Sequence, residues 1–580
     1  MDSEAVNNAQ RGVRLPLATI FLASIILFTY CVYRRALPKP IPGIPCDKVA
    51  AKKVLGSLPS MYSHYKQHGV VMPWLTGHNL KHNAPLVQFF GAPFAQPTVI
   101  LSDFQESQDI LLRRGKEFDR ADRTLQSFEG MIPNHHLAMR SNDPRFKGNK
   151  ELVRDLMSPK FLHEASAVQI YEKSLALINL WSVKVKASGG KPFPARQDIF
   201  DAALDMVSGA AFGFKDDLSL IKRQLNHFLS NGVKFEEHEN GSVDFPRIPV
   251  VAEIATLQAV ADHLGTLIVS PIPRLTYAYS MLTNSKLRQD IAKKDEIITA
   301  QIKKSVESLK DGDENPQSAT DYMVHREFSV ARKEGRELDL FSRRAMDELF
   351  GYIVAGHETT SSSLSWALKL IADHQPEQDK LRQALWEAFP DATAEKRVPT
   401  VKEITTANVP YLDGIIDECL RLGQPTPLVA REAMVDVIVL GHMIPKGVTI
   451  LINSSGPGYT SSPTEVADSV RSETSRINNA VGSWNLDDVH LFKPERWLKT
   501  SDSGEVVYDS QAGPFMSFSL GPRGCFGRRL AYLEMRIVLT LLMWNFRFAK
   551  LEGELAKYDT LEGVTVMPRN CYVGLERLEL

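Results

Sequence analysis

The segment with the clearest chemical potential is a glycine-framed loop that carries one cysteine near the C-terminus. It runs from Phe518 to Gly527 and contains Gly521, Arg523 and Cys525. Glycines let a backbone approach a flat ligand and turn its amides toward a sulfur. The following residues look like the start of a helix, and a helix N-terminus favours a thiolate, which can ligate iron. The alternative is a buried free cysteine, the usual state of an isolated one.

A second polar group lies within residues 340–374, whose apolar periodicity predicts one long helix. Its centre carries Glu358 and Thr359, directly after Ala355, Gly356 and a histidine. A threonine hydroxyl beside a carboxylate can relay protons from solvent, and a hydroxyl in a helix can bond back to a carbonyl one turn earlier. We expect the Thr359 bond to open the helix locally to water. The alternative is a polar patch on a surface helix.

A third candidate is the pair Glu418 and Arg421. Their i,i+3 spacing places both charges on one face of a helix, where they can pair. Such a pair is weak evidence alone, because exposed pairs of this kind contribute only about 0.3 kcal/mol.

The composition describes a folded protein that lacks the charge for binding nucleic acid. The chain has 580 residues, 43% hydrophobic and 24% charged, with 68 basic and 69 acidic residues and a net charge of −1. No excess of positive charge exists to neutralise a phosphate backbone, so we expect no nucleic-acid partner. The five cysteines are scattered and form no C-x-x-C pair, which favours a reducing compartment.

The patterns that must position these residues predict an α+β fold that is mainly α. Amphipathic helices are expected over residues 102–114, 198–212 and 286–309, and a strand–turn–strand unit over 435–452. Residues 453–488 are polar and too long for a normal connection, so we interpret them as a surface insertion without chemistry. We find no repeat and no glycine-rich dinucleotide fingerprint.

The N-terminus predicts a membrane anchor. Nineteen residues from Leu15 to Tyr33 carry no charge and span roughly 28 Å as a helix, about one hydrocarbon core. Arg34 and Arg35 follow where a cleaved signal would have small residues, and the basic excess over 34–53 places the rest of the chain in the cytosol. We expect three parts: an anchor over 1–36, a proline-rich hinge over 37–48 and a catalytic domain over 49–580.

The loop F-x-x-G-x-R-x-C-x-G resembles the heme-binding signature of cytochromes P450, and other segments match the family in the expected order. They are A-G-x-E-T at Ala355, E-x-x-R at Glu418 and F-x-P-E-R-W, which contains Arg496. The resemblance implies the cytochrome P450 fold with heme b as cofactor and Cys525 as the iron ligand. It also implies that Glu418, Arg421 and Arg496 form a buried structural network.

The resemblance assigns further residues to the cofactor. Small Ala355 and Gly356 would admit the macrocycle and dioxygen, while Glu358 and Thr359 would be catalytic in proton delivery. Arginines suit heme propionates, because their forked donors match a carboxylate. Arg154 is an imperfect match, because Lys150 stands where the family has tryptophan. The implied cofactor-binding residues are Cys525, Arg523, Phe518, Gly521, Gly527, Arg431, Arg154, Ala355 and Gly356.

The implied function is that of a monooxygenase in the endoplasmic reticulum membrane. It would insert one atom of O2 into an apolar small molecule, by hydroxylation or epoxidation, with electrons from NADPH–cytochrome P450 reductase. A thiolate ligand favours O–O cleavage. The pattern is similar to fungal microsomal enzymes of secondary metabolite biosynthesis. Two alternatives stay open: an isomerase or dehydratase that needs neither O2 nor reductase, and a non-catalytic heme-binding protein. The apolar pocket candidates are Phe118, Phe128, Met131, Phe228, Phe245 and Leu257.

Overall fold

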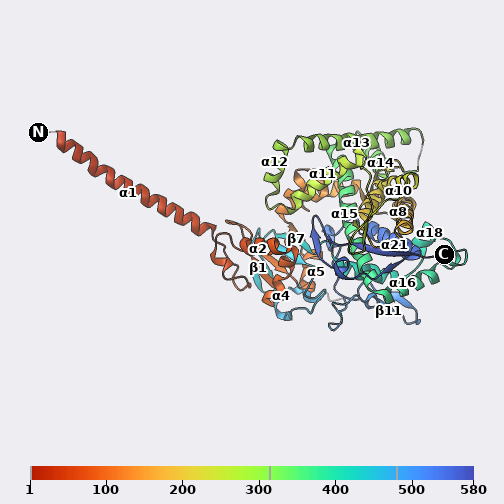
Figure 1. Cartoon of the computed structure of the whole chain (residues 1–580). Helices are drawn as coiled ribbons and strands as arrows, with labels where there is room; N and C mark the ends of the chain where they lie inside the picture. The colour runs from red at the N-terminus through yellow and green to blue at the C-terminus, as the bar shows by residue number, and fades with distance from the viewer. Residues whose placement is uncertain (1–2, 313–314, 478–480, 580) are drawn as a thin grey trace.

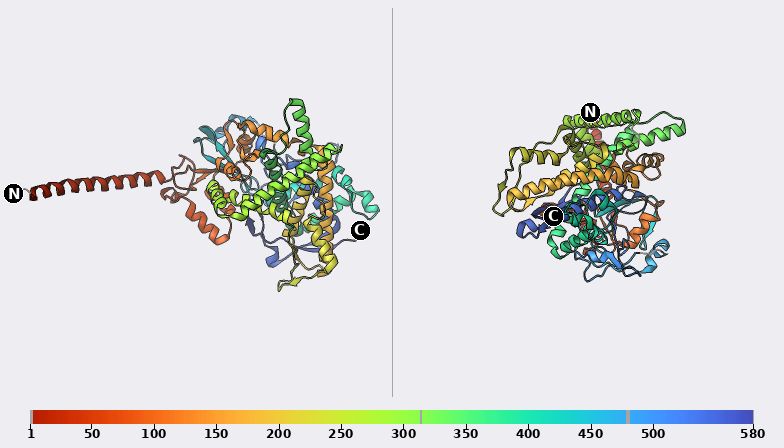
Figure 2. Two further views of the ribbon diagram at one scale, coloured as in Figure 1. Left: turned by 90° about the horizontal axis from the view of Figure 1, so that it is seen from above. Right: turned by 90° about the vertical axis from the view of Figure 1, so that its right-hand side faces the viewer.

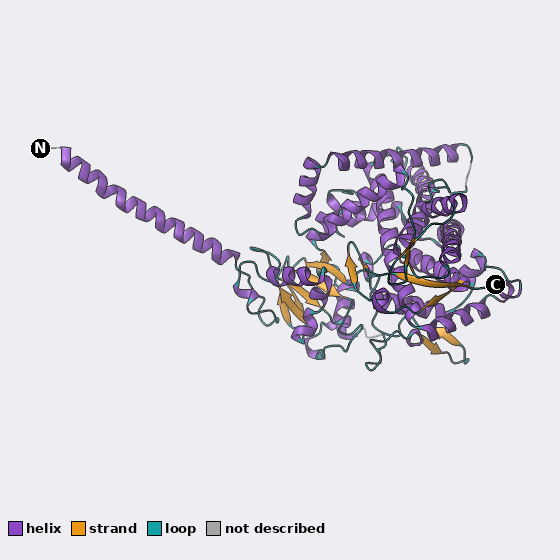
Figure 3. Cartoon of the chain, in the orientation of Figure 1, coloured by secondary structure: helices purple, strands orange, loops and turns teal. Residues whose placement is uncertain are grey.

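The computed structural model describes residues 3–312, 315–477 and 481–579. Helices form most of the body, and strands of the largest sheet lie on the side nearest the N-terminal helix (Figure 3). This confirms the predicted α+β class with predominant helix.

The helices of the body vary widely in length. Their bounds are α2 Leu58–His68, α3 Met72–Thr76, α4 His78–His82, α5 Phe104–Leu112, α6 Asp122–Glu129, α7 Pro144–Leu152, α8 Ala167–Ser188, α9 Arg196–Phe212, α10 Leu220–Asn231, α11 Ala252–Val269, α12 Pro273–Thr283, α13 Ser285–Lys310, α14 Ala319–Glu334, α15 Arg343–Asp373, α16 Gln375–Ala388, α17 Pro390–Ala394, α18 Val401–Thr406, α19 Pro410–Gly423, α20 Glu473–Ile477 and α21 Arg528–Asn545.

One sheet has five strands in the order β1-β2-β10-β7-β3. Strands β2 and β10 are parallel, and the other three pairs of this sheet are antiparallel. A second sheet has the order β13-β16-β4, and the other strands of the described residues form four two-stranded hairpins. The bounds are β1 Leu86–Phe89, β2 Thr98–Leu101, β3 Phe118–Arg120, β4 Phe193–Pro194, β5 Glu236–Glu237, β6 Val243–Asp244, β7 Leu428–Ala433, β8 Val437–Val439, β9 His442–Ile444, β10 Thr449–Asn453, β11 Leu498–Thr500, β12 Val506–Tyr508, β13 Phe546–Ala549, β14 Thr560–Glu562, β15 Val566–Pro568 and β16 Tyr572–Arg577.

The N-terminal helix α1 (Ser3–Ala36) contains the predicted apolar segment and projects away from the body (Figures 1 and 2). Its stretch Thr19–Ala36 is long and apolar enough to cross a membrane once. Apolar side chains on it lie open to solvent, for example Phe28 at 71% exposure. This length and composition are weak evidence for an anchor by themselves, because a signal sequence shares them.

The proline-rich segment after α1 is held against the body. Gln88 on β1 is buried, and its amide donates to the carbonyls of Ile41 (2.9 Å) and Ile44 (2.8 Å) while its oxygen accepts from the Ile41 N–H. Both isoleucines are buried in the core of the five-stranded sheet. The expected hinge over 37–48 therefore packs onto the body over part of its length.

The centre of the body is built around α15, whose first turn is capped by the Ser342 hydroxyl. The C-terminal half of α15 packs with α8, α9, α19 and α21 in the largest apolar cluster. The N-terminal half packs with α11, α13 and α14 in a second cluster. A third cluster lies over the five-stranded sheet. The helix that carries Glu358 and Thr359 therefore runs through the interior, which contradicts the surface-helix alternative.

The predicted insertion is attached to α5. Arg471 forms two hydrogen bonds to the Asp103 carboxylate (2.6 and 2.9 Å), and the Ser472 and Thr474 hydroxyls donate to Asp109 (2.7 and 2.9 Å). Asp103 is also the residue that caps the N-terminus of α5. The insertion thus secures both ends of a helix, a structural role that its polar composition did not indicate.

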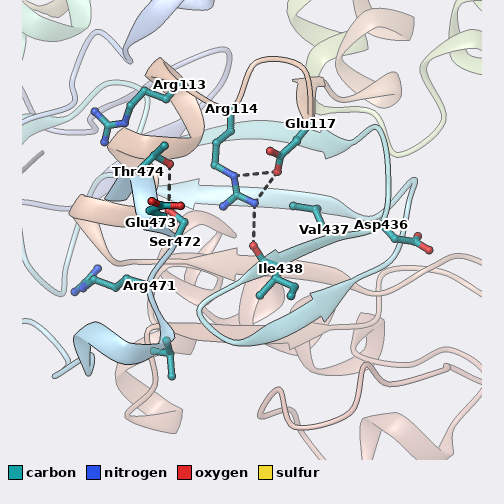
Figure 4. A pocket seen from close by; sticks show the side chains of 11 residues that line it. Arg113, Arg114, Glu117, Asp436, Val437, Ile438, Arg471, Ser472, Glu473 and Thr474 are labelled. Carbon is teal, nitrogen blue, oxygen red and sulfur yellow. Dashed lines mark hydrogen bonds and ion pairs between the residues drawn. The ribbon is translucent and has the colours of Figure 1, made fainter. Parts of the chain in front are cut away.

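An open cavity of about 550 Å³ lies between the end of α5, the β8–β9 hairpin and the insertion (Figure 4). Its walls carry both signs of charge, and Arg114 donates to Glu117 and to the carbonyl of Ile438. Cys525 does not line this cavity. It is therefore separate from the site predicted from the sequence.

Because the insertion is attached through Arg471, we expect removal of this side chain to destabilise the protein. Arg471→Ala should lower the free energy of unfolding by about 1–3 kcal/mol, because a hydrogen-bonded charge pair with little exposure is lost. Urea denaturation measures this, and proteolysis within 466–477 should be faster. Arg476→Ala, an exposed arginine of the same segment, is the control and should change neither. Equal effects of the two variants would contradict the attachment.

Candidate functional site

The cysteine loop is closed by its own backbone. The Cys525 N–H donates to the Phe518 carbonyl at 2.8 Å, and the Gly524 N–H donates to the Gly521 carbonyl at 2.9 Å. Gly521 has φ +71°, and a Cβ there would lie 2.0 Å from the Leu111 carbonyl oxygen at the end of α5. Glycine is therefore required at 521 by conformation and by contact, whereas nothing in the described structure crowds a Cβ at Gly527.

The Cys525 thiol does not ionise readily in the protein alone. Burial raises its pKa, although the Gly527 N–H and the Arg528 charge act in the opposite direction. The residue nevertheless has access to solvent. The predicted stabilisation of the thiolate by amides is therefore present but outweighed by desolvation. A bound metal cation would reverse this balance, because coordination deprotonates a thiol.

The predicted hydroxyl bond within α15 is confirmed. Thr359 Oγ1 donates to the Ala355 carbonyl at 2.8 Å, and Ala355 is exposed although it lies in the middle of a central helix. The helix stays α-helical through this turn, so the expected local opening is not observed. The role of Gly356 beside the cofactor stays a prediction, and the structure adds a packing reason for this glycine. A Cβ there would come within 2.6 Å of Val207 Cγ2, so close packing of α9 requires the glycine.

Glu358 points to the β14–β15 hairpin, where its carboxylate accepts a hydrogen bond from Thr565 Oγ1 at 3.3 Å. Burial raises its pKa, and the nearby Asp262 on α11 raises it further, against the hydrogen bonds from Thr565. A carboxyl group with a raised pKa exchanges protons closer to neutral pH, which suits proton delivery.

Sequence reasoning missed a second carboxyl group behind Thr359. Thr360 Oγ1 donates to Glu534 Oε2 at 2.7 Å and so joins α15 to α21, the helix that follows the cysteine loop. Glu534 is 1% exposed, and burial raises its pKa to about 8. A signal was available, because Glu534 lies in the helix start that the sequence placed directly after the loop.

Arginines from three segments meet at the edge of the site. Arg120 on β3 is paired in register with Arg431 on β7, and both lie close to Arg523 of the cysteine loop. Burial, followed by the repulsion between these charges, lowers the pKa of Arg120 to about 9 and that of Arg431 to about 10. Asp119 is the carboxylate that faces them, and Arg120 Nε is buried without a hydrogen-bond partner. The cluster therefore has spare positive charge and donors.

Arg523 and Arg431 were predicted for this place, whereas Arg120 was missed because no spacing rule joins it to them. Arg154 was predicted and the structure does not bring it here. Its side chain is 63% exposed and pairs with Glu151 and Asp155. The family arrangement fails because α7 ends at Leu152, and the residues after it form a short 3₁₀ turn.

Arg523 is held by the loop that precedes α7. It donates to the carbonyls of His136 (3.2 Å) and Met139 and to Ser141 Oγ (2.8 Å). This loop is attached in turn to α15, where Glu348 accepts from the His136 N–H and from His136 Nδ1, both at 2.8 Å. The loop thus connects the central helix to the cysteine loop.

His135, His136 and Glu348 are close enough together to suggest a metal site, but their hydrogen bonds argue otherwise. The Leu137 N–H donates to His135 Nδ1 at 3.0 Å, so the proton of this ring lies on Nε2, which faces Glu348 at 3.3 Å. Burial lowers the pKa of His135 to about 3, so the ring is neutral. Its coordinating lone pair is already used, and the three residues form a hydrogen-bond network.

The predicted network of Glu418, Arg421 and Arg496 is present. Arg421 donates twice to Glu418 at 2.8 Å, and Arg496 Nε donates to the same carboxylate at 3.1 Å. Trp497 Nε1 also donates to Glu418 (3.0 Å), and Arg421 reaches the Tyr459 carbonyl in the insertion (2.7 Å). These contacts bind α19 to the segments before the cysteine loop.

A ligand for this place must offer a metal to the Cys525 sulfur and acid groups to the arginines. Iron protoporphyrin has both, which defines the class of heme-thiolate proteins. The Cytochrome P450 family model matches residues 81–460 and 487–575, and the chain therefore belongs to the cytochrome P450 family. The unmatched residues 461–486 lie within the predicted insertion.

Curated relatives have similar lengths. The chain is 35% identical to "Cytochrome P450 monooxygenase TRI13" of Fusarium sporotrichioides, over 96% of this chain and 99% of the relative. It is 34% identical to "Cytochrome P450 monooxygenase xilC" of Penicillium rubens, over 94% of each. It is 32% identical to "Cytochrome P450 monooxygenase GME11363" of Pestalotiopsis microspora, over 97% and 98%. The protein is thus an oxidoreductase of the monooxygenase class, which uses O2, a redox partner and a small-molecule substrate.

The residues present fit the heme-thiolate cofactor of the family. Arg120, Arg431 and Arg523 with Asp119 have a net charge of +2, which two propionate groups would neutralise. The unpartnered Arg120 Nε offers a donor that no protein group uses. Buried guanidinium groups need such partners, because uncompensated burial of charge is costly.

The buried carboxyl of Glu534 predicts how stability depends on pH. Folded protein keeps this proton up to about pH 8, whereas the ordinary pKa is 4.5, so the folded state binds more protons between these values. The free energy of unfolding from this group therefore falls as pH rises through that range. Glu534→Gln should show a smaller fall in urea denaturation between about pH 5 and 8 than the parent.

The control is Glu552→Gln, which removes an exposed carboxylate. Its pH profile should match that of the parent protein. A Glu534→Gln profile parallel to the parent would show that the carboxyl ionises freely in the folded state.

Proposed function

We propose that this protein is a heme b monooxygenase that inserts one oxygen atom from O2 into an apolar small molecule, by hydroxylation or epoxidation. The observation that carries the proposal is the Cys525 loop beside a guanidinium cluster with a net charge suited to two propionates. When bound through Cys525, the heme supplies oxygen activation. Arg120, Arg431 and Arg523 would hold its acid groups.

The protein's part in the reaction is to deliver protons. Thr359 holds its hydroxyl proton on the Ala355 carbonyl and can present its oxygen to a proton donor. Glu358, one residue earlier, is half-buried with a raised pKa and faces Thr565, so it can pass protons inward from the hairpin. Together they form the catalytic pair of this proposal.

The substrate would lie against the apolar cluster on the N-terminal half of α15. Phe128, Met131 and Leu257 pack there with Phe350 and Ile353, which supports them as candidates for contact with the substrate. The remaining candidates belong elsewhere: Phe228 and Phe245 lie in the cluster around α8, and Phe118 in the core of the large sheet.

Electrons would come from NADPH–cytochrome P450 reductase at the endoplasmic reticulum membrane, with α1 as a single-pass anchor and the catalytic domain in the cytosol. The three relatives compared above are fungal proteins, and another, 40% identical over 44% of this chain, is named "Hps1-dma1 cluster cytochrome P450 monooxygenase cyp3.1" of Dothistroma septosporum. This supports a role in secondary metabolite biosynthesis. Comparing metabolites of a deletion strain and its parent, with a search for a mass difference of one oxygen, tests the whole proposal.

An isomerase or dehydratase of the same fold is the second candidate, because such an enzyme needs neither O2 nor reductase. The pair Glu358 and Thr359, in a central helix, favours monooxygenation. A deletion strain that accumulates an isomer or hydrate of the product would support the second candidate.

Cys525→Ser should abolish the absorption of the reduced carbon monoxide complex near about 450 nm, which depends on thiolate ligation. The measurement is the reduced-minus-oxidised difference spectrum with carbon monoxide. Cys46→Ser, in the segment beyond α1, is the control and should keep the band. Retention of the band in Cys525→Ser would refute the iron ligand.

Thr359→Ala should raise hydrogen peroxide release per product formed by roughly tenfold or more, because proton delivery to bound oxygen becomes inefficient. Ser363→Ala is the matched control, because this hydroxyl makes the same bond one turn later, to the Thr359 carbonyl at 2.8 Å. The ratio of peroxide to product measures both. Unchanged coupling in Thr359→Ala would remove this residue from the mechanism.

A further inference from the structure

The lysine at position 150 lies on the cysteine loop. Its Nζ donates to the carbonyl of Pro522 at 3.3 Å, and this residue lies between Gly521 and Arg523. Lys150 lies in the last turn of α7, so this helix places a positive charge next to the loop that contains Cys525.

Lys150 also belongs electrostatically to the arginine cluster. Its Nζ lies 5.5 Å from the centre of the Phe146 ring, and the Arg523 guanidinium carbon lies 3.9 Å from the same ring centre. Burial, followed by the charge of Arg523, lowers the pKa of Lys150, as expected for a partly desolvated cation near another one. In the described part of the chain, no acidic side chain forms an ion pair with Lys150.

A count of charges shows what this cation adds. Arg120, Arg431, Arg523 and Asp119 together carry +2, which two propionates would cancel. Lys150 then adds a further positive charge beside the cysteine loop, in addition to that of Arg528. A positive charge stabilises a metal centre more when the centre has gained an electron, because reduction lowers its net charge.

We propose that Lys150 is a tuning residue that raises the reduction potential of the heme iron and so favours acceptance of the first electron. It acts through its charge and does not itself touch the reacting atoms. This inference rests on the proposed heme-thiolate function. The resemblance implied a different role for a positive charge near this helix, namely that Arg154 binds a heme propionate.

The test is potentiometric titration of the purified holoprotein with a chemical reductant, without any reductase, so that docking of a protein partner cannot contribute. Lys150→Met should have a more negative midpoint potential than the parent protein. Lys150→Arg keeps the charge and should restore the parent value. Lys147→Met, an exposed lysine of the same helix, is the matched control and should leave the potential unchanged.

The carbon monoxide spectrum separates failure of this inference from failure of the function. A parent protein without thiolate-type absorption would overturn the proposed function. A parent with that absorption, together with an unchanged potential in Lys150→Met or an equal shift in Lys147→Met, would overturn the role of Lys150 alone. If Lys150→Met loses its heme, the midpoint potentials of Lys150→Gln and Lys150→Arg are compared instead. Equal potentials in these two variants would overturn the proposed role of Lys150.

Discussion

Repulsion between buried cations is the constraint around which the site is organised. Arg120, Arg431 and Arg523 come from two strands and a loop, and one carboxylate, Asp119, faces them. Such an arrangement costs free energy unless an anion joins it. The protein tolerates this cost because surrounding contacts fix each arginine: the sheet register holds two of them, and carbonyls of the loop before α7 hold the third. Folding and cofactor binding are therefore coupled.

Helix α15 and the cysteine loop form two sides of the site, and contacts link them behind the site as well as at its edge. The Thr360–Glu534 bond connects α15 to α21, and the Glu348–His136 bonds connect α15 to the loop that carries Arg523. The helix with the acid–alcohol pair and the loop with Cys525 thus share partners at both ends. Several short contacts set the distance between this helix and this loop. We therefore expect a change in one contact to shift the residues that form the others.

The sequence allowed prediction of what depends on local spacing. The central helix, the pairing of Glu418 with Arg421 and the back-bond of Thr359 follow from positions three or four residues apart. What it could not supply depends on strands and helices distant in the chain. Arg120 joins Arg431 only through sheet register, and the Arg154 side chain is exposed because α7 ends at Leu152, before it reaches this residue. The close packing of Gly356 against Val207 of another helix is likewise a tertiary contact that no local spacing indicated.

Ala355 and Gly356 are neighbours in sequence, and a different contact limits the side-chain size at each. The alanine is assigned to the cofactor site, so a larger side chain there would compete with the cofactor for space. At the glycine, even a methyl group would collide with α9. For libraries designed to alter which molecules this enzyme accepts, both positions are best kept constant, and diversity belongs at apolar candidates on other helices, such as Phe128 and Leu257.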